Sequence, residues 1–225
     1  MDSNKSKEHV FAQGLCGKKL FIIYVLGSIF VFYYEQILNF FRHLISDGTI
    51  FWETRRGVIY GPFSPIYGAG AVLMCYFLLR KKRSDLETFS LSALIGGGFE
   101  YMISFLQETV THTTSWDYSN MFLNINGRTT IPYMAVWGLL GLLLVKFVYP
   151  FISDQIEKIS VDIGNKCFKV LVVFMCLNMF VSWTAIIRQT LRRENIPPYT
   201  PMGKIYDKYY TDERLYRAFP NMRFR

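Results

Sequence analysis

Five apolar stretches constrain the fold of this chain more than any other feature of its sequence. They cover about residues 20–41, 66–79, 88–110, 131–151 and 167–187. All but the second reach or approach the roughly 20 residues that a helix needs to cross a bilayer. The hydrocarbon core has no water to satisfy backbone groups, so a spanning segment of this kind folds as a helix. The sequence therefore predicts an all-α, polytopic integral membrane bundle of about five transmembrane helices.

The segments that flank this bundle differ from it in composition. Residues 1–19 are polar and basic, residues 20–187 form the predicted transmembrane helical domain, and residues 188–225 form a basic, tyrosine-rich tail. We expect the tail to lie outside the membrane. The first apolar stretch is too long for the core of a signal peptide, and no small-residue cleavage site follows it, so we expect it to be retained.

Charge and cysteine content exclude several classes of protein. Charged residues make up 19% of the chain and the net charge is +8, whereas soluble domains carry about 25% charged residues. Basic residues beside apolar spans set topology or contact lipid headgroups. No nucleic-acid-binding motif accompanies them, so the predicted partner is the lipid bilayer and not nucleic acid. The four cysteines lack CxxC spacing and are predicted to be free thiols.

Basic residues do not decide which way the chain crosses the membrane. The short RKKR loop at residues 80–83 favours a cytoplasmic N-terminus, whereas the arginines of the tail favour the opposite orientation. In either orientation, five spans place the loops at about 42–64 and 111–130 on the same side of the membrane. We call this side the loop face.

Two carboxylates lie inside apolar stretches. Glu35 is about six residues, or roughly 9 Å, from the predicted end of the first stretch, and Glu100 lies within the third. Each is on the polar face of its predicted helix. An ionisable group at this depth is costly and predicts a site for a proton, a cation or a substrate. The alternative is structural: an ion pair that fixes helix packing. The possible partners in such a pair are Arg42, Arg55, Arg56 and Arg128.

A second group of polar residues follows Glu100. Glu108 and His112 are four residues apart, so they are neighbours on a helix surface, and Asp117 is close in sequence. These three types of side chain can bind a divalent metal, but there is no HExxH motif and an interfacial hydrogen bond explains the pair equally well. We assign no metal site, no cofactor and no catalytic residue. The chain also lacks a Walker A motif.

Three segments together resemble one family of bacterial membrane proteins. They are ETRRGVIYGPFSPIYG, FEYMISFLQETVTHTTSWDYSNMFLNINGR and WGLLGLLLVKFVYP. From about residue 32 to 152, and again in its tail, the chain resembles the family called putative ABC-transporter type IV, or putative ABC-transporter permease. The resemblance implies a permease-like subunit in the bacterial plasma membrane. It also implies a partner, which is a separate ATPase or another membrane subunit.

The resemblance also marks individual positions. The family pattern includes Glu35, Arg56, Glu100, Glu108 and Arg128, the residues that we expect to line a polar cavity or substrate site. It implies structured loops built on Gly57, Gly61, Pro62, Trp116, Asp117, Tyr118, Asn126 and Gly127. Before Glu35, the chain has two tyrosines where the family commonly has Gly-Trp.

Two other functions fit the same residues. The first is an intramembrane enzyme that acts on lipid or peptide, with Glu108, His112 and Asp117 as metal ligands or acid–base groups. The second is a membrane scaffold or sensor whose polar loops bind another protein. The absence of a recognised catalytic motif favours the permease over the enzyme.

Overall fold

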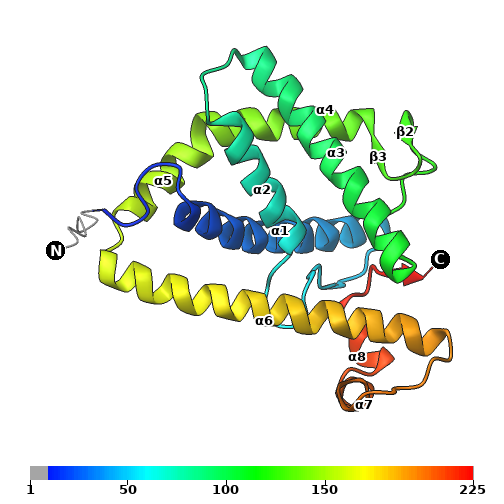
Figure 1. The fold of residues 1–225 in the computed structure, drawn as a ribbon. Helices are drawn as coiled ribbons and strands as arrows, with labels where there is room; N and C mark the ends of the chain where they lie inside the picture. Colours follow the sequence, from blue (N-terminus) through cyan, green and yellow to red (C-terminus); the bar gives the residue numbers. More distant parts are fainter. Residues whose placement is uncertain (1–9, 225) are drawn as a thin grey trace.

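Helices dominate the computed structural model, which describes residues 10–224 (Figure 1). The helical segments are α1 (Gly17–Ser46), α2 (Pro65–Leu78), α3 (Asp85–Thr111), α4 (Ile131–Leu143), a π-helical turn η1 (Leu144–Val148), α5 (Tyr149–Glu157), α6 (Val161–Arg193), α7 (Pro201–Tyr209) and α8 (Asp212–Ala218). The strands are short: β1 (Thr113–Thr114), β2 (Asn124–Ile125), β3 (Thr129–Thr130) and β4 (Arg223–Phe224). The prediction of an all-α bundle is confirmed.

Within the described residues, 4 helical segments are long and apolar enough to cross a membrane. They are α1, α3, α6 and the continuous segment Ile131–Glu157 that joins α4, η1 and α5. The remaining predicted span is α2, a helix of 14 residues. At 1.5 Å per residue it is about 21 Å long, shorter than the roughly 30 Å hydrocarbon core. The chain is therefore a multi-pass bundle in which α2 packs between longer helices.

The helices of this bundle approach closely where glycine faces a small side chain. A Cβ atom on Gly68 of α2 would lie 2.2 Å from Oγ of Ser28 on α1. A Cβ on Gly141 of α4 would lie 1.9 Å from Oγ of Ser92 on α3. Both contacts require glycine, because no larger residue fits without moving a backbone. They set the positions of α1 against α2 and of α3 against α4.

The loops and the tail meet at one end of the molecule (Figure 1). Strands β1 and β4 pair antiparallel, with Thr113 opposite Phe224, and so join the third loop to the tail. The first loop reaches α6, where the amide of Ile59 donates to Oγ of Ser182 at 2.8 Å. The first loop also reaches the tail, where the hydroxyls of Tyr60 and Tyr210 lie 3.0 Å apart. The predicted loop face is therefore a packed layer to which the tail contributes.

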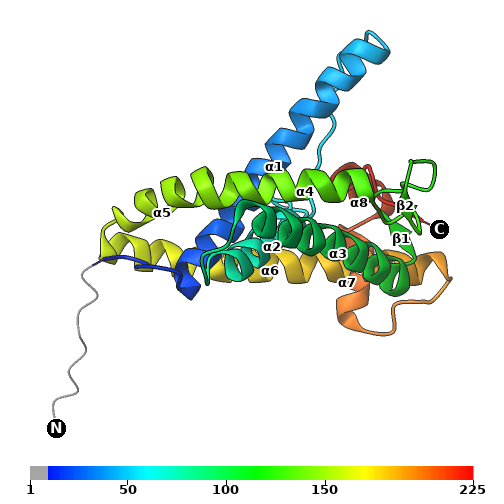
Figure 2. The same cartoon turned by 90° about the horizontal axis from the view of Figure 1, so that it is seen from above.

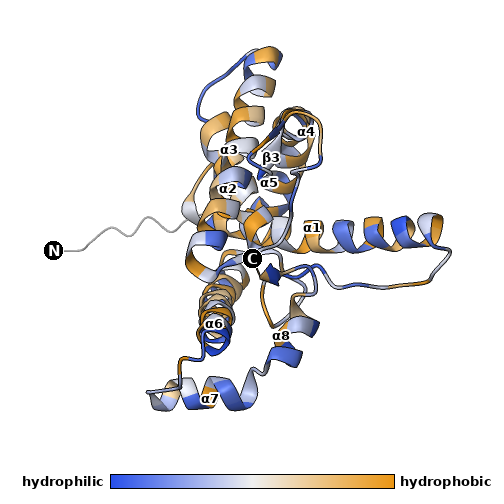
Figure 3. Ribbon diagram, turned by 90° about the vertical axis from the view of Figure 1, so that its right-hand side faces the viewer, coloured by the Kyte–Doolittle hydropathy of each residue, from blue (hydrophilic) through white to orange (hydrophobic). Residues whose placement is uncertain are grey.

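Helix α1 extends further than the sequence indicated. It continues to Ser46, past the expected end near residue 41, because Leu44 and Ile45 continue its apolar pattern. Its C-terminal half projects from the bundle (Figures 2 and 3). Several apolar side chains on this half are exposed, including Phe41 at 51% and Ile45 at 83%. Glu35 consequently lies further from the end of its helix than predicted.

The chain before α1 is packed against the opposite end of the bundle. Phe11 is 1% exposed and would contact any side chain placed at Gly164. Lys19 is fully buried and pairs with Glu157, while its Nζ donates to Oγ of Ser153 at 2.6 Å. Lys19 was counted among the basic residues of the N-terminal flank, and it is instead neutralised inside the fold. The lysines at positions 5 and 7 lie outside the described residues.

Candidate functional site

Glu100 of α3 is held by hydroxyl groups from the third loop. Its Oε1 accepts a hydrogen bond from the Tyr118 hydroxyl at 3.0 Å, and its Oε2 accepts one from Oγ1 of Thr129 at 2.8 Å. The carboxylate is half-buried. The loop after α3 therefore folds back onto the helix and contacts it at this residue.

Glu35 of α1 is held in a similar way. It accepts a hydrogen bond from the hydroxyl of Tyr67, which is in the first turn of α2. Arg55 is near enough to act on this carboxylate electrostatically, but its Nη2 is 2.7 Å from Oε2 of Glu53. Arg55 is therefore paired with a residue of its own loop.

The two carboxylates belong to one cluster. Burial keeps water from the Tyr118 hydroxyl and raises its pKa well above the usual range, and the charge of Glu100 raises it further. Glu35 adds to this effect, so both carboxylates act on the same hydroxyl. We call Glu35, Tyr67, Glu100 and Tyr118 the carboxylate–tyrosine cluster. It brings together α1, α2, α3 and the third loop.

The third loop is hydrogen-bonded so that Tyr118 is fixed. The amide of Tyr118 donates to the carbonyl of Gly127 at 2.8 Å, and Nε1 of Trp116 donates to the carbonyl of Arg128 at 2.9 Å. Asp117 Oδ1 accepts from the amide of Ser119 at 2.9 Å, forming an Asx turn.

The turn opposite Tyr118 contains two residues with positive φ, Asn126 and Gly127. Gly127 has φ +68°, and a Cβ there would lie 2.4 Å from Oγ of Ser119. Asn126 also has a positive φ, and its Nδ2 donates to the Tyr101 hydroxyl on α3 at 2.9 Å. The turn is thereby tied to the same helix that carries Glu100.

The first loop has its own internal bonds. The amide of Gly57 donates to the carbonyl of Phe63 at 2.9 Å, across a turn in which Gly61 has φ +75° and Pro62 follows. Arg56 donates from Nη1 to the carbonyl of Ile59 at 3.0 Å and from Nε to Thr54 at 3.1 Å. Arg56 therefore supports the loop and makes no ion pair with Glu35 or Glu100 in the part of the chain described.

Glu108 and Arg128 pair with each other and not with the cluster. Arg128 Nη2 lies 2.5 Å from Oε2 of Glu108, and both side chains are largely buried. The guanidinium also lies 5.5 Å from the ring centres of Tyr101 and Phe105. Arg128, which was a possible partner for Glu35 or Glu100, is therefore paired with Glu108. The pair joins the third loop to the last turn of α3.

His112 is turned away from Glu108. It caps α3 with φ 50°, and its Nε2 is 3.8 Å from Oε1 of Glu194 on the tail side. Over residues 10–224, no three His, Cys, Asp or Glu side chains gather as a metal site would need. The three residues considered as ligands therefore face different partners.

Neither carboxylate of the cluster has a basic partner among residues 10–224. No lysine, arginine or histidine nitrogen lies within 4.0 Å of Glu35 or Glu100. Sequence reasoning selected both carboxylates and Tyr118 but not Tyr67 or Thr129. Tyr67 lies in the PIYG segment that carried the family resemblance, so a signal was available for it. No sequence signal was available for Thr129, because a threonine after a turn does not by itself indicate a functional residue.

The four long apolar helices among residues 10–224 indicate a multi-pass membrane protein. Residues 20–183 match the family described as Putative ABC-transporter type IV, and this is most of the chain, so the chain belongs to that family. Its family and its helices together make it a membrane protein related to transport. No curated protein and no solved structure matches the chain.

Proposed function

We propose that this chain is a permease-like subunit of a transport system, in which the carboxylate–tyrosine cluster binds a proton or another cation. One observation carries the proposal: Glu35 and Glu100 accept hydrogen bonds from Tyr67, Tyr118 and Thr129, and no described basic side chain pairs with either. A structural ion pair was the alternative, and the arginines that could have formed it have other partners or no contact with the cluster.

The physical argument concerns the free energy of an uncompensated charge. A carboxylate away from water is costly unless a positive charge or a proton neutralises it. Hydroxyl donors offset part of that cost without neutralising it. The site therefore favours uptake of a positive charge.

The loop residues take a supporting role in this proposal. Arg56 holds the first loop, and the Glu108–Arg128 pair holds the third loop, which carries Tyr118. Their contribution is to position the hydroxyl donors and not to contact the cation. This differs from the sequence hypothesis, which placed all three at the cavity itself.

Energy for transport would come from another chain, because this one has no nucleotide-binding motif. We propose a separate ATPase or another membrane subunit as that partner, in the bacterial plasma membrane. Residues 20–187 would form the membrane domain and residues 188–225 the tail on the loop face. No cofactor is part of the proposal.

The cation site is tested by infrared difference spectroscopy on the purified, reconstituted protein as pH is changed. We expect a carboxylic-acid band that is lost in part in Glu35→Gln and in Glu100→Gln. Glu194→Gln is the matched control, because Glu194 is exposed and outside the cluster. A spectrum in which both cluster variants keep the full band, and in which Na⁺ and K⁺ change no carboxylate band, would contradict the proposal.

The partner is tested separately, by cross-linking in native membranes followed by purification of the full chain. We expect an ATPase or a further membrane subunit to be recovered with it. Recovery of the chain alone, together with unimpaired transport in a deletion strain, would remove the transport assignment.

A further inference from the structure

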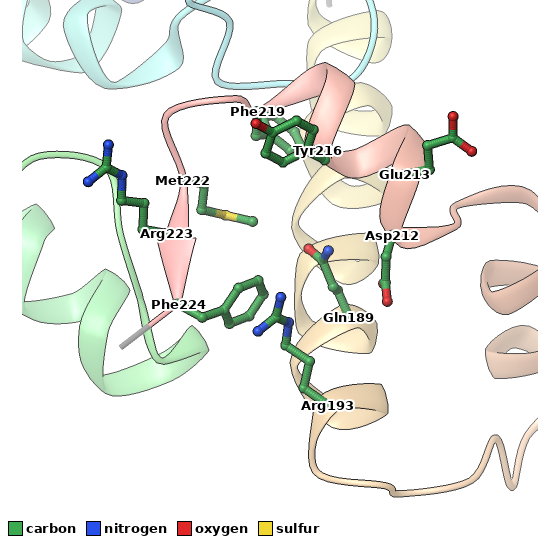
Figure 4. A pocket seen from close by; sticks show the side chains of 9 residues that line it. All are labelled: Gln189, Arg193, Asp212, Glu213, Tyr216, Phe219, Met222, Arg223 and Phe224. Carbon is green, nitrogen blue, oxygen red and sulfur yellow. The ribbon is translucent and has the colours of Figure 1, made fainter.

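A cavity of about 510 Å³ lies on the loop face, away from the carboxylate–tyrosine cluster. It is bounded by the last two turns of α6, by α8 and by β4 (Figure 4). Its size is within the range of small-ligand sites, which are about 300–1,000 Å³. Nothing in the proposed function uses it.

One buried polar group in this cavity has no partner. Gln189 is 4% exposed, and its Oε1 accepts no hydrogen bond from any residue among 10–224. Figure 4 shows its amide directed into the cavity. A buried acceptor without a donor costs roughly 1–3 kcal/mol, so such groups in folded proteins are normally satisfied. A ligand with a hydroxyl or amine donor would satisfy Oε1 of Gln189.

The acidic residues of the cavity wall are already paired. Asp212 Oδ1 lies 2.6 Å from Nη2 of Arg192, and Glu213 Oε1 lies 2.5 Å from Nη2 of Arg217. Neither of these two arginines lines the cavity. The acidic side chains thus add little negative charge to its interior.

The basic residues of the wall, by contrast, remain available. Arg193 and Arg223 have no carboxylate partner within 4.0 Å among residues 10–224. The Arg193 guanidinium lies 3.7 Å from the ring centre of Phe224. Stacking on a ring leaves the in-plane N–H groups free to bind a phosphate or carboxylate. The wall is suited to an anion beside an aromatic surface.

Helix α7 indicates the depth of this cavity relative to the bilayer. It is seen end-on in Figure 1, where α6 lies in the plane, and side-on in Figure 3. If α6 spans the membrane, α7 is parallel to its surface. Its outward side is apolar and flanked by lysines, as in helices that lie in the interface. The exposed residues are Tyr199, Met202, Lys204, Ile205, Lys208 and Tyr209.

The cavity is slightly further from the membrane centre than α7. The Tyr206 hydroxyl of α7 lies 3.0 Å from Oγ1 of Thr184, which gives the level of this helix along α6. Gln189 is five residues later on α6, or roughly 7.5 Å further out. The headgroup layer is about 5–7 Å thick on each side. Gln189 therefore lies at headgroup level.

We propose that this cavity binds a hydroxylated, anionic phosphate group, as carried by a phospholipid headgroup. Arg193, stacked on Phe224, would hold the phosphate, and a hydroxyl would donate to Oε1 of Gln189. A soluble polyol phosphate shares this chemistry, so the experiment separates the two sources. The inference is independent of the cation site, which lies on other residues.

The test uses the full chain in nanodiscs of phosphatidylcholine to which phosphatidylglycerol is added. Native mass spectrometry measures the lipid retained by the wild type and by the cavity variants Arg193→Gln and Gln189→Leu. Arg223→Gln is a nearby control, because the Arg223 guanidinium points away from the cavity (Figure 4). Loss of a charge-assisted bond should weaken retention of phosphatidylglycerol about tenfold. Lys82→Gln removes the same charge at the other end of the bundle and should leave retention unchanged. In detergent, glycerol 1-phosphate and inorganic phosphate are titrated against the same set.

Each outcome decides between the possibilities. Retention that falls in Arg193→Gln and Gln189→Leu, and not in Arg223→Gln or Lys82→Gln, supports a lipid headgroup. Binding of glycerol 1-phosphate with the same sensitivity, without selective lipid retention, supports the site and assigns it a soluble ligand. Equal retention in all variants, with no binding of either phosphate, overturns the proposal. Because Arg193 is exposed, its variant remains informative if Gln189→Leu fails to fold.

Discussion

Two groups of charged side chains in this molecule differ in how their carboxylates are compensated. In the tail, Asp207 accepts from Nε and Nη2 of Arg188, both at 2.8 Å, and also pairs with Arg192. In the carboxylate–tyrosine cluster, Glu35 and Glu100 accept from uncharged donors, which are hydroxyls and the indole of Trp137. With Asp212 also on Arg192, the first arrangement balances two carboxylates against two arginines and fixes the tail to α6. The second leaves charge uncompensated, which destabilises the empty site but allows it to bind a cation.

Asp207→Ala removes the carboxylate that pairs with Arg188 and Arg192, and so tests the first arrangement most directly. We expect the tail to lose about 2 to 4 kcal/mol of local stability, because Arg188 would be left buried without its carboxylate. Hydrogen exchange across α7 and α8 measures the loss. Glu213→Ala is the control: its pair with Arg217 is exposed and should contribute less than about 1 kcal/mol. Equal protection in the two variants would mean that the tail does not depend on this pair.

The Glu108–Arg128 pair is a direct ion pair like those of the tail, although it lies beside the cluster. Arg128→Met should destabilise the third loop by about 1 to 3 kcal/mol, since a partly buried charge-assisted bond is lost. Hydrogen exchange between β1 and β3 reports the change. If the loop stays fully protected in Arg128→Met, the pair does not hold the loop and our assignment of Arg128 to a supporting role is wrong.

The stability of the tail and that of the cluster should also depend differently on pH. Hydrogen bonds from Arg188 hold the pKa of Asp207 below its ordinary value near 3.8. A carboxylate with a depressed folded-state pKa stabilises the fold above its unfolded pKa, and that stability is lost as pH falls through the folded value. Tail protection should therefore be constant down to about pH 4 and decrease below it. Exchange measured over a pH series tests this, and a loss beginning near neutral pH would contradict it.

The smallest effect on stability is expected in the cluster itself. Glu35→Gln and Glu100→Gln keep an oxygen that can accept from Tyr67 or Tyr118, so the fold should change by less than about 0.5 kcal/mol. The thermal midpoint of the reconstituted protein measures it. Cation binding, in contrast, should be lost. Destabilisation as large as that of Asp207→Ala would show that the carboxylates are structural and would remove the contrast between the two regions.

The sequence predicted the helices because their signal is local. Apolar residues at helical spacing and the roughly 20-residue length placed α1, α3, α4–α5 and α6 correctly. The ends were less accurate: α1 runs to Ser46 because apolar residues continue after the first charge. The carboxylates Glu35 and Glu100 were also found locally, since a charged residue inside an apolar stretch is conspicuous.

Partners could not be predicted in the same way. Whether Glu35 meets Tyr67 or Arg55 depends on the tilt of α1 against α2, which the close contact at Gly68 sets. The tail was read as a basic extramembrane segment, and its sequence gave no indication that Phe224 would pair with Thr113. Such contacts join residues far apart in the chain, and the local periodicity of a sequence does not predict them.

The pairing of β1 with β4 has a consequence for how the molecule is made. A chain synthesised from its N-terminus can insert α1 to α6 while its last residues are still being added. The loop after α3, however, meets its strand partner only when Arg223 and Phe224 exist. Assembly of this loop therefore waits for synthesis of the tail. A change at Phe224 would also reach the loop that positions Tyr118.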